Sequence, residues 1–162
     1  MWQSSASQSF RISAIQGSFM LKRLKRDRMN LTTQSLASKN NNILLVDDDQ
    51  SLREVISIIL TDEGYNVLQA DNGQTALNLL TKMTANEYPS CMILDLMMPI
   101  MSGDEFLEVL QRNHAPDLGK IPVIICSAEG KHKSYQQIVA KLEKPINVEL
   151  LCGAIKGCSE LH

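Results

Sequence analysis

The sequence predicts an α/β fold in which helices cover both faces of a doubly wound, five-stranded parallel sheet of order 2-1-3-4-5. From residue 42 onward, short apolar segments alternate with segments whose apolar residues recur at helical spacing. Such alternation is typical of βαβ units, which place parallel strands in one sheet. The short segments are apolar at nearly every position, as expected for strands that are buried on both faces. Five strands within about 120 residues fit this strand order.

The composition allows one packed domain and an additional segment. The chain has 162 residues, of which 44% are apolar and only 4% aromatic, so the core must be built mainly from Ile, Leu, Val and Met. Residues 1–40 contain seven basic residues and one acid, whereas residues 41–162 contain nine basic residues and seventeen acids. The folded part is therefore acidic, and its bulk charge gives no reason to expect nucleic-acid binding.

Residues 1–40 form a basic, serine-rich leader that we expect to be disordered. This segment has eight serines, resembles an organelle transit peptide in composition, and lacks the apolar core of a secretory signal. Two alternatives are a surface-binding helix around FMLKRLKRDRM and a true start at Met20 or Met29. Residues 41–162 remain as the folded domain, and no apolar stretch approaches the length of a membrane span.

The first half of the folded domain contains two predicted strand–helix pairs. NILLV, residues 42–46, and YNVLQA, residues 65–70, are runs of strand-forming residues. A helix is expected over residues 51–64, where Gly64 ends a series of apolar residues at helical spacing: Leu52, Val55, Ile56 and Ile59. A second helix is expected over residues 71–83, with Asp71 or Asn72 as its N-cap. Its inward-facing residues would be Ala76, Leu77, Leu80 and Met83.

The second half continues the alternation with three strands and three helices. The strands are expected in SCMILD, IPVIICS and AKLE, which are residues 90–95, 121–127 and 140–143. A helix over residues 102–113 would face the core with Phe106, Leu107 and Leu110. A short helix is expected over residues 133–139. The last helix is expected over residues 147–157, with Asn147 as its cap.

The four cysteines are expected to be reduced and structural. Cys91 and Cys126 lie within apolar strands, where a buried thiol is usual. Cys152 and Cys158 are six residues apart, and a zinc site would need two further ligands that the sequence does not supply. This cysteine usage is typical of a cytosolic protein.

Charged and polar residues follow several of the predicted strands. Asp47, Asp48 and Asp49 follow the first strand, Asp95 ends the third, Ser127 ends the fourth, and Lys144 follows the fifth. Ligands of an open α/β sheet bind at the carboxyl ends of the strands, where the strand order reverses. Each of these residues, taken singly, also has a structural explanation as a helix cap, a turn residue or a surface charge. These single-residue explanations do not predict that such residues should occur together at the ends of four separate strands.

Several carboxylates beside one lysine are suited to phosphoryl chemistry with a divalent cation. Mg²⁺ prefers oxygen ligands and is held by one or two carboxylates together with phosphate oxygens. Such a cation would relieve the repulsion among the aspartates and leave one carboxylate free as a nucleophile toward phosphorus. The ammonium group of Lys144 would neutralise charge on the transferred phosphoryl group.

Four motifs in order resemble the receiver domains of two-component response regulators, over residues 43 to about 157. They are ILLVDDDQSLRE, MILDLMMPIMSG, IICSAE and EKPI. The resemblance implies a flavodoxin-like fold, phosphorylation of Asp95, and Mg²⁺ bound by Asp48 and Asp95, by Asp47 through water, and by the backbone carbonyl of Met97. It implies that Ser127 is the switch hydroxyl, that Lys144 pairs with the phosphoryl group, and that the Lys144–Pro145 bond is cis. Asp49 falls outside the acidic pair and is expected to cap a helix.

The chain departs from the family pattern near its last strand. Lys141 occupies the position three residues before the lysine where the family commonly has an aromatic residue, for which Tyr135 is a candidate substitute. The stretch from Ser127 to Lys144 is also short. Apolar Met97 cannot orient a hydrolytic water, whereas Glu129 could.

The leading hypothesis is a single-domain receiver that accepts a phosphoryl group on Asp95 from a histidine kinase or phosphotransfer protein. It would then switch the binding of a downstream protein or relay the phosphoryl group, and it would work in the cytoplasm. One alternative is a receiver-like interaction module that no longer switches, which Lys141 and the shortened stretch favour. A second is a phosphohydrolase with Asp47 as its nucleophile, for which the sequence leaves no room for a cap domain. A third possibility is that the leader directs the domain to a membrane or nucleic acid.

Overall fold

The computed structural model describes residues 40–158, except for residues 113–116 and 129–134. Five parallel strands form one sheet of order β2-β1-β3-β4-β5, as the sequence predicts. The strands are β1 (Asn42–Val46), β2 (Asn66–Ala70), β3 (Cys91–Leu94), β4 (Val123–Ser127) and β5 (Ile138–Glu143). The described helices are α2 (Gln50–Asp62), α3 (Gly73–Leu80), α4 (Gly103–Arg112) and α5 (Val148–Cys158), with short 3-10 turns at Ala85–Glu87 and Leu118–Lys120.

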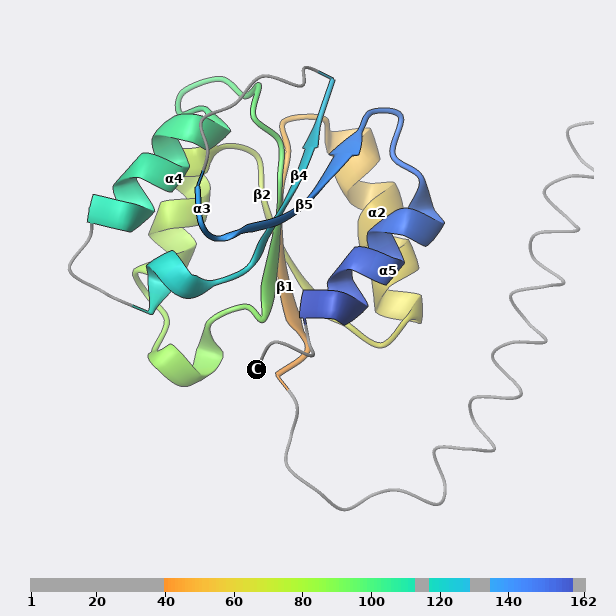
Figure 1. The fold of residues 1–162 in the computed structure, drawn as a ribbon, viewed down its shortest axis with the longest axis horizontal. Helices are drawn as coiled ribbons and strands as arrows, with labels where there is room; N and C mark the ends of the chain where they lie inside the picture. Colours follow the sequence, from red (N-terminus) through yellow and green to blue (C-terminus); the bar gives the residue numbers. More distant parts are fainter. Residues whose placement is uncertain (1–39, 113–116, 129–134, 159–162) are drawn as a thin grey trace, which may run out of the picture. The chain divides into compact units, whose positions relative to one another are not determined.

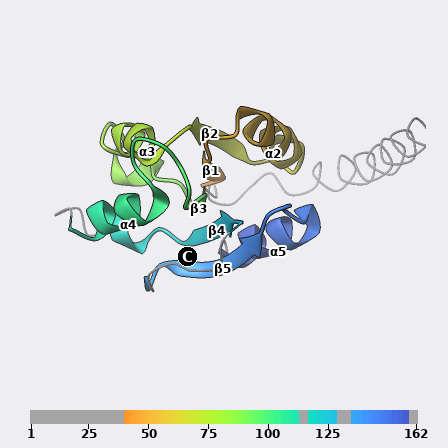
Figure 2. The same ribbon diagram turned by 90° about the horizontal axis from the view of Figure 1, so that it is seen from above.

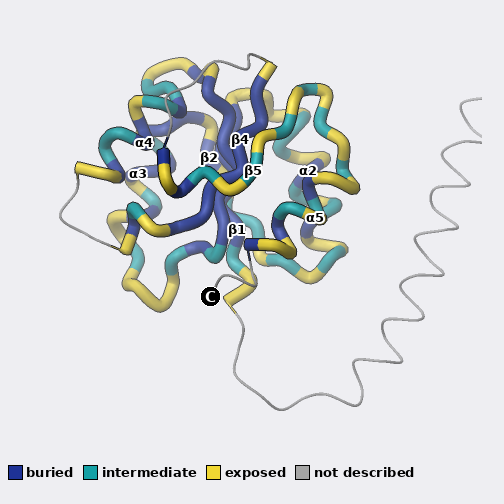
Figure 3. The backbone as a smooth tube through the Cα atoms, in the orientation of Figure 1, coloured by how far each residue is buried: buried dark blue, intermediate teal, exposed yellow. Residues whose placement is uncertain are grey.

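The sheet lies between two layers of helices. Helices α3 and α4 cover one face, and α2 and α5 cover the other (Figures 1 and 2). Each face has its own apolar cluster, because successive strand residues point to opposite sides. The three central strands, β1, β3 and β4, are buried along almost their whole length (Figure 3), which agrees with their nearly continuous apolar sequences.

Side-chain caps fix the point at which each helix leaves the sheet edge. The Asp49 carboxylate accepts the Leu52 N–H at 3.1 Å, and the Asn72 side chain accepts the Thr75 N–H at 2.9 Å. Asn147 accepts the N–H groups of two residues in the first turn of α5. These contacts satisfy backbone donors that have no partner within the helix. They confirm Asp49 and Asn147 as caps and select Asn72 over Asp71.

Helix α4 begins with a reciprocal cap. Glu105 Oε2 accepts the Ser102 N–H at 2.9 Å, and Ser102 Oγ accepts the Glu105 N–H at 3.3 Å. The Ser102 N–H and the Ser102 hydroxyl both donate to the Glu105 carboxylate, and these two hydrogen bonds lower the pKa of Glu105. The pair is the S-x-x-E capping box, and it sets the start of the helix that follows the Asp95 loop.

Two expectations about packing and secondary structure are wrong. Val55 is 54% exposed rather than facing the core, because the buried stripe of α2 passes through Ile56 and Leu60, four residues apart. The helix expected over residues 133–139 is absent from its described part: residues 136–137 form a turn, and Ile138 begins β5. The Val123 N–H donates to the Gln137 carbonyl at 2.8 Å, so pairing with β4 draws this segment into the sheet.

Candidate functional site

The strand order brings the ends of β1 and β3 side by side. Val46 and Leu94 are partners in the parallel ladder, and the Asp95 N–H donates to the Val46 carbonyl at 2.9 Å. The next residue of each strand is an aspartate, so Asp47 and Asp95 emerge at the same edge. This edge lies where the strand order reverses, the position at which open α/β sheets bind ligands.

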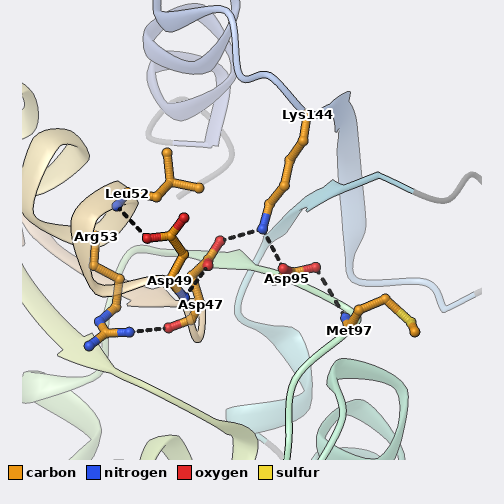
Figure 4. Close-up of polar contacts among 7 residues, drawn as sticks. All are labelled: Asp47, Asp49, Leu52, Arg53, Asp95, Met97 and Lys144. Atoms are coloured by element: carbon orange, nitrogen blue, oxygen red, sulfur yellow. Dashed lines mark hydrogen bonds and ion pairs between the residues drawn. The ribbon is translucent and has the colours of Figure 1, made fainter.

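Asp47 is a buried carboxylate held by its own loop. Its side chain is 3% exposed, and its Oδ1 accepts the Asp49 N–H at 2.9 Å. The Arg53 guanidinium donates to the Asp47 backbone carbonyl at 2.5 Å (Figure 4). Asp48, by contrast, is exposed. The loop therefore presents one fixed buried carboxylate and one exposed carboxylate side by side.

Lys144 joins the ends of β1 and β3. Its Nζ lies 2.8 Å from Asp47 Oδ2 and also contacts Asp95 Oδ2 (Figure 4). Burial of the ammonium group by itself lowers the pKa of Lys144, but hydrogen bonds and charge from Asp47 and Asp95 outweigh burial, and the pKa is raised. The Lys144–Pro145 peptide bond is cis, as predicted. The ammonium group is therefore firmly charged between two buried carboxylates.

Asp95 is fixed on both of its oxygens. Oδ1 accepts the Met97 N–H at 3.1 Å, and Oδ2 contacts Lys144. Gly103, the first residue of α4, packs directly against the backbone of this loop: a Cβ there would lie 2.9 Å from Leu96 Cα and closer still to the Asp95 carbonyl oxygen. The Gly103 N–H donates to the Leu96 carbonyl at 3.1 Å. The start of α4 thus supports the loop that carries Asp95.

Three carboxylates are close enough to share one cation. One oxygen from each of Asp47, Asp48 and Asp95 lies within 4.8 Å of the others. All three donors are carboxylate oxygens, which suits a hard divalent ion such as Mg²⁺. Lys144 already places one positive charge against two of them, so the site is built to hold positive charge. The donor set therefore fits the predicted metal site.

The remaining predicted residues lie around this centre. Ser127 is 4% exposed at the end of β4, and its carbonyl accepts the Lys144 N–H at 3.3 Å. Met97 is 62% exposed beside Asp95. Lys141 lies exposed on β5, whereas Tyr135 packs in the core and donates a hydrogen bond to the Asp104 carbonyl at 3.3 Å. Glu129 is outside the described residues.

Beneath the site, burial raises the pKa of the Cys126 thiol to about 12.

The supporting roles of two residues escaped sequence reasoning. Arg53 lies in the first turn of α2, where the sequence offers only a basic residue on a helix. Gly103 is the first residue of α4 and the last residue of the motif MILDLMMPIMSG, but the sequence alone assigns it no contact. Both act on the backbone of the site loops, and contacts to backbone atoms leave no pattern in a single sequence.

The comparisons with known proteins agree with this geometry. A family model for the response regulator receiver domain matches residues 43–156. The chain belongs to this family. Receiver domains are in general signalling domains rather than enzymes, and they generally bind Mg²⁺ at an acidic cluster.

Relatives of this receiver domain include proteins of different lengths. It is 37% identical over 121 residues to the response regulator RR06 of Streptococcus pneumoniae, covering 72% of this chain and 52% of that one. It is 33% identical over 122 residues to sporulation initiation phosphotransferase F of Bacillus subtilis, covering 72% and 92%. The chain thus spans about half the length, or less, of several curated relatives that it matches.

A solved receiver structure shares the fold of this chain. The chemotaxis response regulator CheY4 of Vibrio cholerae is 28% identical, with a TM-score of 0.61 over 72% of this chain and 97% of that one. Among the described residues, none of the helices combines the length and apolar character that a membrane span requires.

Proposed function

We propose that this receiver domain accepts a phosphoryl group on Asp95 from a phosphohistidine of a histidine kinase or phosphotransfer protein, and that Mg²⁺ is required. The observation that carries the proposal is the grouping of Asp47, Asp48 and Asp95 with Lys144 at the reversal point of the sheet. The likeness to a sporulation phosphotransferase, over 92% of its length, supports a role in phosphoryl transfer.

The chain's own residues divide the work of the transfer. An Asp95 carboxylate oxygen attacks phosphorus, the bond from phosphorus to the donor imidazole breaks, and the imidazole nitrogen keeps the electron pair. The Met97 N–H orients the carboxylate through Oδ1. The Lys144 ammonium group, now paired with Oδ2, would move onto a phosphoryl oxygen and offset its charge.

Residues from the loops after β1 and β3 would supply the metal ligands. Asp48 and Asp95 would bind Mg²⁺ directly, Asp47 through a water, and the Met97 carbonyl would complete the protein ligands. When bound, the ion would neutralise charge on the phosphoryl oxygens. Asp47 would keep its place with or without the ion, because the Asp49 N–H holds its carboxylate and the Arg53 guanidinium holds its backbone carbonyl.

Phosphorylation by a small phosphodonor tests the proposal. Purified protein treated with acetyl phosphate and Mg²⁺ should gain one phosphoryl group in its intact mass, and excess EDTA should abolish the gain. Asp95→Asn should gain none. Asp49→Asn is the matched control, because Asp49 is a neighbouring carboxylate that caps α2, and this variant should still be phosphorylated. Equal phosphorylation of Asp95→Asn would refute the assignment.

A receiver-like module that binds its partner without switching is the second candidate. Lys141 lies exposed on β5 in place of the family's aromatic residue, and the described residues between β4 and β5, Ala128 and 135–137, form no helix. Backbone amide chemical shifts, measured by NMR before and after addition of beryllofluoride and Mg²⁺, distinguish the switching receiver from the non-switching module. Shifts that spread into β5 and α5 support the switch, whereas shifts confined to the site loops support the module. The family match gives no support to a phosphohydrolase with Asp47 as its nucleophile.

A further inference from the structure

All four cysteines lie in one layer of the protein, and one of them, Cys126, lies beneath the acidic site. Cys91, Cys126 and Cys158 belong to the buried apolar cluster between the sheet and helices α2 and α5, and Cys152 packs against that cluster. All four are free thiols. Four cysteines on one face of the sheet do not by themselves indicate a reactive site. Two of them, however, are in direct contact.

Cys91 and Cys158 come together across 67 residues of sequence. Cys91 is the first residue of β3 and Cys158 is the last residue of α5, and their sulfur atoms are 3.1 Å apart. This separation is shorter than ordinary contact between two sulfur atoms and is about 1 Å longer than a disulfide bond. Both side chains are almost fully buried, at 0% and 1% exposure.

We propose that Cys91 and Cys158 form a reversible disulfide on exposure to hydrogen peroxide. The Cys158 sulfur attacks one peroxide oxygen and the O–O bond breaks, which gives a sulfenic acid and one water. The Cys91 sulfur then attacks the Cys158 sulfur, the S–O bond breaks, and a second water leaves. The two thiols lose two electrons to the peroxide, and their two protons end in the two waters.

The contact also distinguishes the roles of the two sulfurs. The Cys91 thiol donates a hydrogen bond to Cys158 Sγ, and this bond lowers the pKa of Cys158. The same bond, together with burial, raises the pKa of Cys91. Cys158 is also at the last turn of α5, and helix ends open more readily than central strands. It is therefore the thiol that a small oxidant would reach when the end of α5 opens, whereas Cys91 lies on the central strand β3 and resolves the intermediate.

The bond would tie together two elements that carry residues of the acidic site. Asp95 follows β3, and Lys144 precedes α5, so both lie at the opposite end of these elements from the two cysteines. The disulfide would fix the carboxyl end of α5 to the amino end of β3. Since the closed loop is long, the melting temperature of the oxidised protein should rise by about 10 °C.

Oxidation of the full chain with hydrogen peroxide tests this proposal. The wild-type protein should lose the mass of two hydrogen atoms, and digestion without reduction should yield a joined peptide containing Cys91 and Cys158. A thiol reductant should restore the original mass and melting temperature. Cys152→Ser is the matched control on the same helix and should behave as wild type, whereas Cys158→Ser should form no such peptide.

Two results would overturn the proposal, and both are read from the wild-type protein, so they do not depend on the folding of a variant. One is a joined peptide that contains Cys126 or Cys152 in place of Cys91 or Cys158. The other is oxidation that only adds oxygen atoms, with no loss of hydrogen and no rise in melting temperature.

Discussion

Replacement of Lys144 by Met tests whether the ammonium group holds the acidic edge together. The variant keeps the length of the side chain and removes its charge, and it leaves Asp47 and Asp95 buried without their cationic partner. At an effective dielectric constant of about 20, a pair at 2.8 Å has a Coulomb energy of about 6 kcal/mol. Desolvation of the ammonium group cancels part of that energy, and removal of one member of a buried pair generally costs about 3–5 kcal/mol.

The lower end of that range applies here. The Lys144 side chain remains 21% exposed, so solvent screens part of the interaction. We therefore expect Lys144→Met to lower the free energy of unfolding by about 3 kcal/mol at neutral pH without divalent ions. Urea unfolding in the presence of EDTA measures the loss, and saturating Mg²⁺ should recover part of it, because the ion supplies positive charge to the same carboxylates.

Lys120→Met is the control for this experiment. Lys120 pairs with Asp117 at 3.2 Å, but the two side chains are 71% and 60% exposed, so this substitution should cost less than about 1 kcal/mol. If Lys144→Met costs no more than Lys120→Met in EDTA, the ion pairs at the sheet edge do not hold the site. If Mg²⁺ stabilises the variant less than it stabilises the wild type, the ion does not occupy the same carboxylates.

Three further outcomes are expected. The pKa of Lys144 is raised in the folded state, so its contribution is complete below about pH 10.4 and is lost as the pH rises through the folded-state pKa. The stability gap between wild type and Lys144→Met should therefore shrink as the pH rises through the alkaline range. Gly103→Ala should cost about 2 kcal/mol of unfolding free energy, because its Cβ would press on the backbone of Asp95 and Leu96. Ile100→Gly should raise stability by about 0.5–1 kcal/mol, because Ile100 has a φ of 69° and is 82% exposed.

Denaturant unfolding of matched control variants distinguishes these outcomes from nonspecific effects of substitution. Denaturant unfolding at a series of pH values measures the difference in stability between wild type and Lys144→Met, and a difference that widens as the pH rises through the alkaline range would contradict the assigned sign. Gly153→Ala should not destabilise, because nothing lies within 4 Å of its Cβ position. Ile100→Ala should bring no gain, since Ala keeps the Cβ that makes a positive φ costly. Equal stabilisation by Ala and Gly at residue 100 would contradict backbone strain as the cause.

Sequence patterns were sufficient to predict an element where its local hydrogen-bonding needs and its buried face agreed. The strands with nearly continuous apolar residues, the caps at Asp49 and Asn147, and the stop at Gly64 were all predictable. They were predictable because backbone donors at a helix start need a side-chain acceptor, and a φ of 94° favours glycine. The prediction failed over residues 133–139, where pairing with β4 overrode helical spacing and Ile138 became the start of the edge strand.

The sequence by itself determined the fold class and the identity of the acidic residues, because both depend on the order and spacing of residue types along the chain. Only the tertiary structure decided that Lys144 bridges Asp47 and Asp95, that Gly103 supports the Asp95 loop, and that Cys91 meets Cys158. These contacts join residues that are distant along the chain or involve backbone atoms. Their geometry is fixed by the register of the parallel strands and the packing of helices on the sheet, and a single sequence does not encode either in a local pattern.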